Sequence, residues 1–150
     1  ALTIIEGPKE ALLRLKDAGY LLLVTTNQPD VARGTQSQEA VEKIHQYMRK
    51  ELPLDDFFVC YHDGDGCDCR KPKPGLIEQG QRKYDVDLSK SYMIGDRWRD
   101  IDAGHAAGLT SILLDYQYKE RGPSREPELR VKTLGEAVDW ILKQSEQSSL

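Results

Sequence analysis

The residues best suited to chemistry lie in one short stretch, CYHDGDGCDCRKP, at positions 60–72. It holds all three cysteines of the chain and one of its three histidines. Cys60 and His62 are followed by Cys67 and Cys69, which gives three thiols and one imidazole. This set matches the four ligands of a tetrahedral zinc site and leaves no position for water. The spacing therefore predicts a structural zinc site rather than a catalytic one.

Two alternatives to zinc stay open for these thiols. A disulfide would leave one of the three cysteines over and would need an oxidising compartment. The cysteines can also be free thiols in a reduced surface loop. Residues 1–5 carry no basic segment followed by a long apolar run, so they do not indicate a signal peptide and we expect a cytoplasmic protein. Clustered Cys and His in such a reducing compartment favour a metal site.

Arg70 and Lys71 follow the last thiol directly. A loop held by a metal would present these two cations in a fixed place. Arginine binds phosphate as a bidentate fork and lysine as a point charge, so the pair suits a phosphate group. In most proteins the string RKPKP is only a basic surface patch, and the surrounding elements must decide between the two interpretations.

Two further polar clusters follow apolar runs. Thr26 and Asn27 come after the run at 20–25 and offer a hydroxyl, an amide and backbone N–H groups. Gly95 and Asp96 come after the run at 91–94, and a carboxylate there is a hard oxygen ligand for Mg²⁺. Asp100 lies one helical turn further on, where it can support that site or cap a helix.

The elements that must position these residues alternate between strand and helix. Strands are expected at 20–25, 57–61, 91–94 and 110–114. Helices are expected at 8–19, 37–50, 74–84, 100–107 and after Thr133, with an exposed loop at 115–130 and a frayed tail at 145–150. This alternation predicts an α/β fold with a doubly wound, Rossmann-like parallel sheet flanked by helices. Ligands bind such sheets at the carboxyl ends of the strands, where the polar clusters fall.

Composition restricts the partners. The net charge of -4 argues against non-specific nucleic-acid binding and against a zinc-ribbon-like nucleic-acid module. No apolar run approaches the roughly 18 residues that a membrane span requires. We expect a single domain over 1–150, monomeric or dimeric, with a small molecule as its partner.

Three stretches together resemble the haloacid dehalogenase-like (HAD) phosphatase superfamily, subfamily IIIA. They are VTTNQPDVARG (24–34), CYH…CDCRKPKPG (60–75) and MIGDRWRDIDAG (93–104), in the order and spacing of the family. The branch they resemble contains D-glycero-D-manno-heptose 1,7-bisphosphate phosphatase and histidinol-phosphatase. The resemblance implies a HAD-like fold without a large cap domain. It also implies a Mg²⁺-dependent phosphatase for a small phosphorylated metabolite, such as a sugar bisphosphate.

The same resemblance assigns roles at the phosphate. Thr26 and Asn27 would hydrogen-bond the transferring phosphoryl group. Lys71 would neutralise the phosphate and the nucleophile, and Arg70 would help to bind the substrate. Arg33, in the first of the three stretches, could also reach the substrate.

Metal-binding roles follow from the resemblance as well. Asp96 would bind the catalytic Mg²⁺ and Asp100 would support it. The family branch also carries a structural zinc, whose ligands correspond to Cys60, His62, Cys67 and Cys69.

One departure from the family pattern concerns catalysis. The family uses an aspartate nucleophile and an aspartate general acid/base in a D-x-D motif after its first strand, ahead of the helix that begins here at Pro8. Residues 2–8 resemble the lead-in to that helix. We therefore expect the chain as given to lack the motif and the central strand, and to be inactive or nearly so. The aspartate pairs at 63/65, 85/87 and 100/102 lie in the zinc hairpin, a turn and a helix and are not expected to replace the motif.

The expected lack of this motif keeps a second interpretation open. The chain could be a catalytically inactive fragment, or a module that binds a phosphate ligand or scaffolds a partner. An in-frame upstream segment with an apolar strand ending in D-x-D would discriminate between the two.

Overall fold

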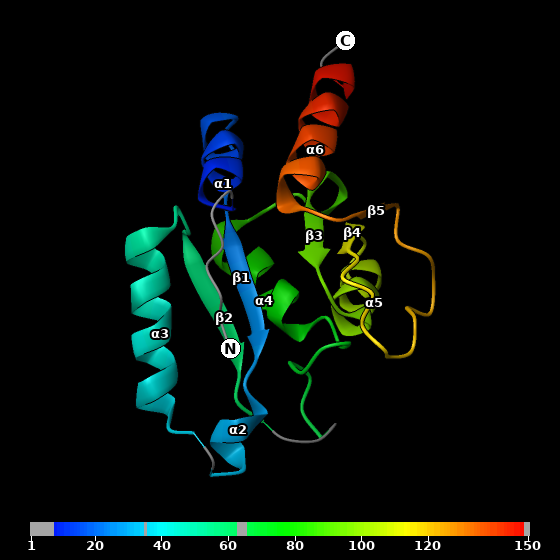
Figure 1. The fold of residues 1–150 in the computed structure, drawn as a ribbon. Coiled ribbons are helices and arrows are strands. Elements are labelled where there is room, and N and C mark those ends of the chain that lie inside the picture. Colours follow the sequence, from blue (N-terminus) through cyan, green and yellow to red (C-terminus); the bar gives the residue numbers. More distant parts are fainter. Residues whose placement is uncertain (1–7, 35, 63–65, 149–150) are drawn as a thin grey trace.

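A computed structural model describes residues 8–34, 36–62 and 66–148. Helices and strands alternate along the chain (Figure 1). The strands are β1 (Leu23–Asn27), β2 (Asp56–Cys60), β3 (Tyr92–Gly95), β4 (Thr110–Leu114) and β5 (Leu129–Val131). The helices are α1 (Pro8–Asp17), α2 (Pro29–Ala32), α3 (Gln38–Glu51), α4 (Gly75–Tyr84), α5 (Trp98–Ala106) and α6 (Leu134–Ser148), with a 3₁₀ turn η1 (Leu88–Lys90).

All strand pairs are parallel, as the alternation predicts. β1 pairs with β2, with Val24 opposite Phe57. β3, β4 and β5 form a second sheet, in which Ile94 lies opposite Ile112. β1 and β3 point the same way (Figure 1), but within the described residues no strand is hydrogen-bonded between them. The α/β class with parallel strands is confirmed, with two sheets in this part of the chain.

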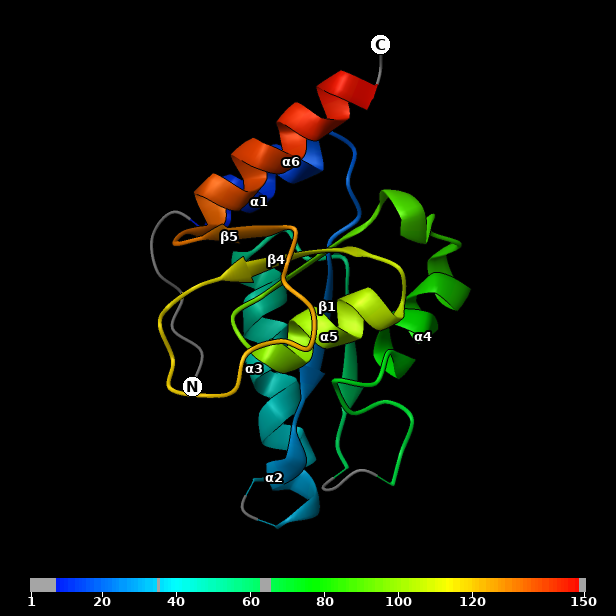
Figure 2. The same ribbon diagram turned by 90° about the vertical axis from the view of Figure 1, so that its right-hand side faces the viewer.

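Helices cover both faces of the second sheet. α1 and α6 pack against each other on one side of β4, and α5 lies on the other (Figure 2). The core on the α1–α6 side consists of buried apolar residues: Ala11, Leu15, Leu22, Ile112, Ala137, Val138 and Ile141. On the α5 side, Ala103 is fully buried in a cluster with Met93. α4 packs on β1 and β2, so each strand end is backed by a helix.

Side-chain caps begin two of the predicted helices. Ser37 Oγ accepts a hydrogen bond from the backbone N–H of Ala40 at 3.0 Å and starts α3. Thr133 Oγ1 accepts one from Glu136 at 3.1 Å and starts α6. Both caps satisfy N–H groups that have no partner within the helix. After α1, Gly19 adopts a φ of 94°, the left-handed conformation that glycine takes readily.

The structure differs from the expected elements in several places, among them the short helices α2 and η1, which the sequence analysis does not predict. β1 begins at Leu23 rather than at 20, because Leu22 exchanges hydrogen bonds with Asp55 instead of continuing a sheet ladder. The predicted loop at 115–130 ends in β5, whose three residues are too few to show a strand pattern. α6 continues to Ser148, so residues 145–148 of the predicted tail are helical, and 149–150 lie outside the described residues.

No helix in the described ranges is both long and apolar enough to cross a membrane.

Candidate active site and Cys/His metal centre

The polar residues after β1, β2 and β3 meet at one pocket of about 330 Å³. Parallel strands bring their carboxyl ends to the same edge, so these clusters converge although they are far apart in sequence. The pocket is lined by Thr26, Asn27, Arg70, Lys71, Asp96, Arg97, Arg99 and Asp100. Four of these side chains are cationic and two are carboxylates. The pocket therefore favours an anion, although the chain as a whole carries a net charge of -4.

Lys71 is held from both sides of the pocket. Its Nζ donates to the carbonyl of Thr25 at 3.0 Å and to Oδ1 of Asp100 at 2.5 Å. The Lys71 and Asp100 side chains are only 12% and 10% exposed, so little water screens this ion pair. Asn27 fixes the lysine backbone, because its Oδ1 accepts from the Lys71 N–H at 3.1 Å and its Nδ2 donates to the Lys71 carbonyl at 3.4 Å.

Asp100 both caps α5 and partners Lys71. Its Oδ2 accepts a hydrogen bond from the backbone N–H of Arg97 at 3.3 Å, ahead of the first turn of the helix. Gly95 makes room for it, since a Cβ at this position would clash with the Asp100 side chain. The turn after β3 therefore needs a glycine in order to bring Asp100 under the pocket.

Asp96 offers a carboxylate that is suited to Mg²⁺. Its Oδ2 accepts a hydrogen bond from the Tyr118 hydroxyl at 3.1 Å, and no described residue donates to its Oδ1. Proteins often hold Mg²⁺ through one or two carboxylates, with water and phosphate oxygens completing the octahedron. A half-buried carboxylate with one open oxygen in a cationic pocket fits that role.

Of the other predicted site residues, some line the pocket and others do not. Thr26 lines the pocket, and its Oγ1 accepts a hydrogen bond from Gln28 Nε2 at 3.1 Å. Arg33 is exposed after α2 and is not among the lining residues, so the structure does not bring it to the pocket. Among the described carboxylates only Asp96 and Asp100 line the pocket.

Of the alternative aspartate pairs, 85/87 does not enter the pocket, and of the pair 100/102 only Asp100 lines it, whereas Asp102 bonds to Ser124. Asp85 ends α4 in a left-handed conformation, and Asp87 caps η1 through Ser89. Asp63 and Asp65 lie outside the described residues, as does most of the stretch 2–8 that resembles the family lead-in.

Sequence reasoning missed three residues at this site. Arg97 and Arg99 line the pocket, and their position just after Asp96 in a strand-end turn was a usable signal. Tyr118, which contacts Asp96, lies 22 residues further along the chain in a segment without a motif. Only the tertiary structure connects it to the site.

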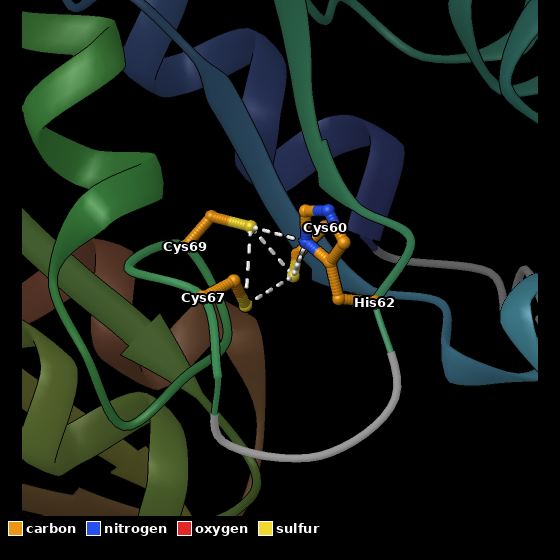
Figure 3. Close-up of side chains that lie close together, drawn as sticks. All are labelled: Cys60, His62, Cys67 and Cys69. Carbon is orange, nitrogen blue, oxygen red and sulfur yellow. Dashed lines mark hydrogen bonds between the residues drawn. The ribbon is translucent and has the colours of Figure 1, made fainter.

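Cys60, His62, Cys67 and Cys69 form a compact cluster. Their side chains point toward one another from the end of β2 and the loop that follows (Figure 3), with all ligand atoms within 4.8 Å of each other. Two Sγ–Sγ distances are 3.6 Å, and His62 Nδ1 lies 3.5 and 3.3 Å from the sulfurs of Cys60 and Cys69. Zinc–sulfur bonds of about 2.3 Å imply tetrahedral edges of about 3.8 Å. The Cys60–Cys69 pair, at 2.7 Å, is shorter than such an edge.

The crowded thiols shift one another's pKa values in opposite directions. Burial alone would raise the pKa of Cys67, but hydrogen bonds from the backbone of Arg70 and Cys69 outweigh it and lower this pKa to about 6. Burial, with the neighbouring thiols of Cys60 and Cys67, raises the pKa of Cys69 to about 12. Thiolates this close repel one another unless a metal neutralises them, so the donor set fits Zn²⁺.

The Cys/His loop is tied to the start of α4, beside the pocket. Lys73 Nζ donates to the carbonyl of Cys67 at 2.6 Å, and the Gly75 N–H donates to the carbonyl of Asp68 at 3.1 Å. Gly75 has no room for a Cβ against the backbone of Asp68. The Cys/His loop, which precedes Lys71 in the sequence, and α4, which follows it, thus both help to fix its position.

Comparison with known proteins identifies the family to which the chain belongs. The HAD-hydrolase-like family model matches residues 68–137. Some relatives are more than 30% identical to this chain in sequence, and the chain covers more than two thirds of their length. The chain belongs to the HAD-like hydrolase family.

Several similar relatives belong to one branch of this family, the heptose bisphosphate phosphatases. One is the D-glycero-beta-D-manno-heptose-1,7-bisphosphate 7-phosphatase of Haemophilus ducreyi, 37% identical over 73% of this chain and 68% of the relative. The Helicobacter pylori protein of the same name is 35% identical over 91% of this chain and 81% of the relative. Among solved structures, the D,D-heptose 1,7-bisphosphate phosphatase of B. bronchiseptica, complexed with magnesium and phosphate, is 30% identical. It superposes with a TM-score of 0.80 over 93% of this chain and 84% of that one. The predicted family and branch are confirmed.

Proposed function

We propose that this chain forms a Mg²⁺-dependent phosphomonoester hydrolase of carbohydrate metabolism that acts on a small sugar bisphosphate, such as heptose 1,7-bisphosphate. The observation that carries the proposal is the cationic pocket on which the ends of β1 and β3 and the loop after β2 converge. The relatives that are heptose bisphosphate phosphatases support the choice of substrate.

Several of the lining residues have a proposed role in phosphoryl transfer. Catalysis of this transfer depends mainly on positioning and on neutralising charge. Lys71, fixed by Asp100 and Thr25, would balance the charge of the equatorial phosphate oxygens. Thr26 and Asn27 would hydrogen-bond the phosphoryl group.

Two arginines are proposed to bind the substrate. Arg70 would do so from within the pocket. Arg33 remains a weaker proposal, because in this structure it does not line the pocket.

The proposed reaction needs an aspartate nucleophile and an aspartate general acid/base. The nucleophile would attack phosphorus to form an aspartyl-phosphate, while the acid protonates the leaving sugar oxygen and then activates water. Asp96 and Asp100 are engaged as metal ligand and lysine partner, so the pair has to come from outside the described residues. Without it we expect little or no turnover.

Two metals belong to the proposal. Mg²⁺ bound by Asp96 would supply charge neutralisation at the phosphate. Zn²⁺ bound by the Cys/His cluster would be structural, because four protein ligands leave no open position. Thiols that stay reduced for zinc favour a cytoplasmic location. We further propose a single domain over residues 1–150 that functions as a monomer or dimer.

The decisive experiment is a malachite-green assay of phosphate release from sugar mono- and bisphosphates. It should compare the 150-residue chain with a version extended upstream through its own coding sequence. We expect release from the extended version and little or none from the 150 residues. Failure of the extended version to release phosphate from any substrate would contradict the proposed activity.

Substitutions in the extended version would test the roles. Asp96→Asn and Lys71→Ala should each lower kcat about a hundredfold or more, because each removes charge from the transition-state environment. Asp85→Asn is the matched control, since Asp85 is exposed and asparagine tolerates its left-handed conformation. Near-normal rates in Asp96→Asn or Lys71→Ala would overturn the assignments.

A phosphate-binding module without catalysis is the second candidate. It is favoured by the cationic pocket that, in the described residues, lacks a second pair of carboxylates. Calorimetry with inorganic phosphate would separate the two candidates. Binding that is lost in Lys71→Ala, without turnover in either length of the protein, would support the binding module.

A further inference from the structure

The segment between β4 and β5 is bound along the first turns of α5. The Tyr118 hydroxyl donates to Oδ2 of Asp96 at 3.1 Å. Glu120 Oε2 accepts from the backbone N–H of Trp98, the first residue of α5, at 3.0 Å. Ser124 donates to Asp102 from its backbone N–H and from its hydroxyl, both at 2.8 Å. The segment therefore has several separate anchors on the helix that begins at the pocket.

Within this segment, contacts run in series toward Asp96. Glu120 Oε1 accepts from the guanidinium of Arg97 at 2.7 Å. That guanidinium carbon lies 3.9 Å from the centroid of the Tyr118 ring, within the range of a cation–π contact. Arg97 thus holds the ring from its face while the hydroxyl reaches the carboxylate.

We infer that Tyr118 is a positioning residue for Asp96: by binding Oδ2 it orients the carboxylate and leaves Oδ1 available to a divalent cation. Glu120 and Arg97 hold Tyr118 in the conformation that makes this contact. The inference rests on the proposed function, in which Asp96 binds Mg²⁺. Carboxylates that bind metals are commonly oriented by such hydrogen bonds, and loss of the partner typically weakens metal affinity by about 10- to 100-fold.

The test is the affinity for Mn²⁺, measured by calorimetry or by electron paramagnetic resonance without substrate. Tyr118→Phe keeps the ring and the arginine contact but removes the hydrogen bond, so its Kd for Mn²⁺ should rise about tenfold. Glu120→Gln should raise Kd by a smaller factor, because it weakens the contacts of Glu120 with Arg97 and Trp98 but leaves the Tyr118 hydroxyl in place.

Tyr116→Phe is the matched control. The Tyr116 ring is a neighbour of Tyr118, with centroids 5.9 Å apart, and its hydroxyl bonds to no described residue. This variant should keep the wild-type Kd. Activity gives a second readout, in which Tyr118→Phe should need more Mg²⁺ for half-maximal rate while reaching a near-normal rate at saturation.

The outcomes separate this inference from the proposed function. An unchanged Mn²⁺ Kd in Tyr118→Phe, with binding still lost in Asp96→Asn, would overturn the inference alone. A low rate at every Mg²⁺ concentration would also contradict it, because it would point to a role other than orienting the metal ligand. Absence of any Mn²⁺ binding that depends on Asp96 would overturn both.

Discussion

At the scale of single residues, Gly95 is a position with no room for a side chain. It lies at the end of β3, where a Cβ would clash with Asp100 and come within 2.5 Å of its Oδ2. Asp100 in turn accepts from Lys71. The absence of a side chain at one position thus allows an ion pair between two other elements.

Gly95→Ala should therefore impair both folding and function. We expect the free energy of unfolding to fall by about 1–3 kcal/mol, as for other overpacked sites, because Asp100 must move. Urea denaturation and phosphate-release assays of the extended protein would measure the two effects. Gly122→Ala is the control, since a Cβ there meets nothing within 4 Å. Equal effects of the two substitutions would contradict this account of Gly95.

At the scale of elements, the loop after β2 connects the proposed metal centre to Lys71, the proposed catalytic lysine. The last proposed zinc ligand, Cys69, is two residues before Lys71. The loop backbone is bonded to Asn27, the last residue of β1, and to the start of α4. Loss of the metal should therefore displace Lys71, although the metal itself takes no part in the proposed reaction.

Cys67→Ser should lower zinc content well below one equivalent and reduce thermal stability, because a three-ligand site binds zinc less tightly. Atomic absorption and thermal denaturation would measure these changes. The control is Ser89→Ala, because Ser89 is exposed and lies outside the Cys/His loop. This variant should keep its zinc. One full equivalent of zinc in Cys67→Ser would rule out the proposed ligand set.

At the scale of the whole molecule, one buried carboxylate joins three elements at the end of the sheet opposite the pocket. Asp56 begins β2 and accepts from Arg49 of α3 at 3.0 Å, and from Lys83 and Tyr84 of α4 at 2.6 and 2.7 Å. Burial alone would raise its pKa, but the hydrogen bonds from Lys83, from Tyr84 and from the Phe57 N–H lower it from 3.8 to about 2.

The lowered pKa predicts acid sensitivity. The folded state binds the proton of Asp56 less tightly than the unfolded state, so its stabilisation is present above pH 3.8 and is lost as pH falls toward 2. A shift of about two pKa units corresponds to at most about 2–3 kcal/mol of folding stability. The true contribution is smaller, because solvent screens the partly exposed partners Arg49 and Lys83. The difference in unfolding free energy between wild type and Asp56→Asn should shrink over this pH range. Glu10→Gln is the surface control, and a difference that does not change with pH would refute the assignment.

Much of this architecture follows from local sequence. Buried apolar runs predicted the parallel strands, and Ser37 and Thr133 marked helix starts that the structure confirms. The clustered thiols and histidine predicted a compact ligand set, because residues within ten positions of one another can meet without help from the rest of the fold. The three family stretches predicted the HAD-like class, which the relatives confirm.

Only the tertiary structure decided the contacts between distant segments. The partner of Lys71 in α5, the arginines that enter the pocket, and the support of Asp96 by Tyr118 all depend on how strand ends and loops pack. Periodicity and turn residues report on a neighbourhood of a few residues, whereas these contacts span 22 to 29 residues along the chain. Their geometry is set by the crossing of helices over parallel strands, which no single stretch of sequence contains.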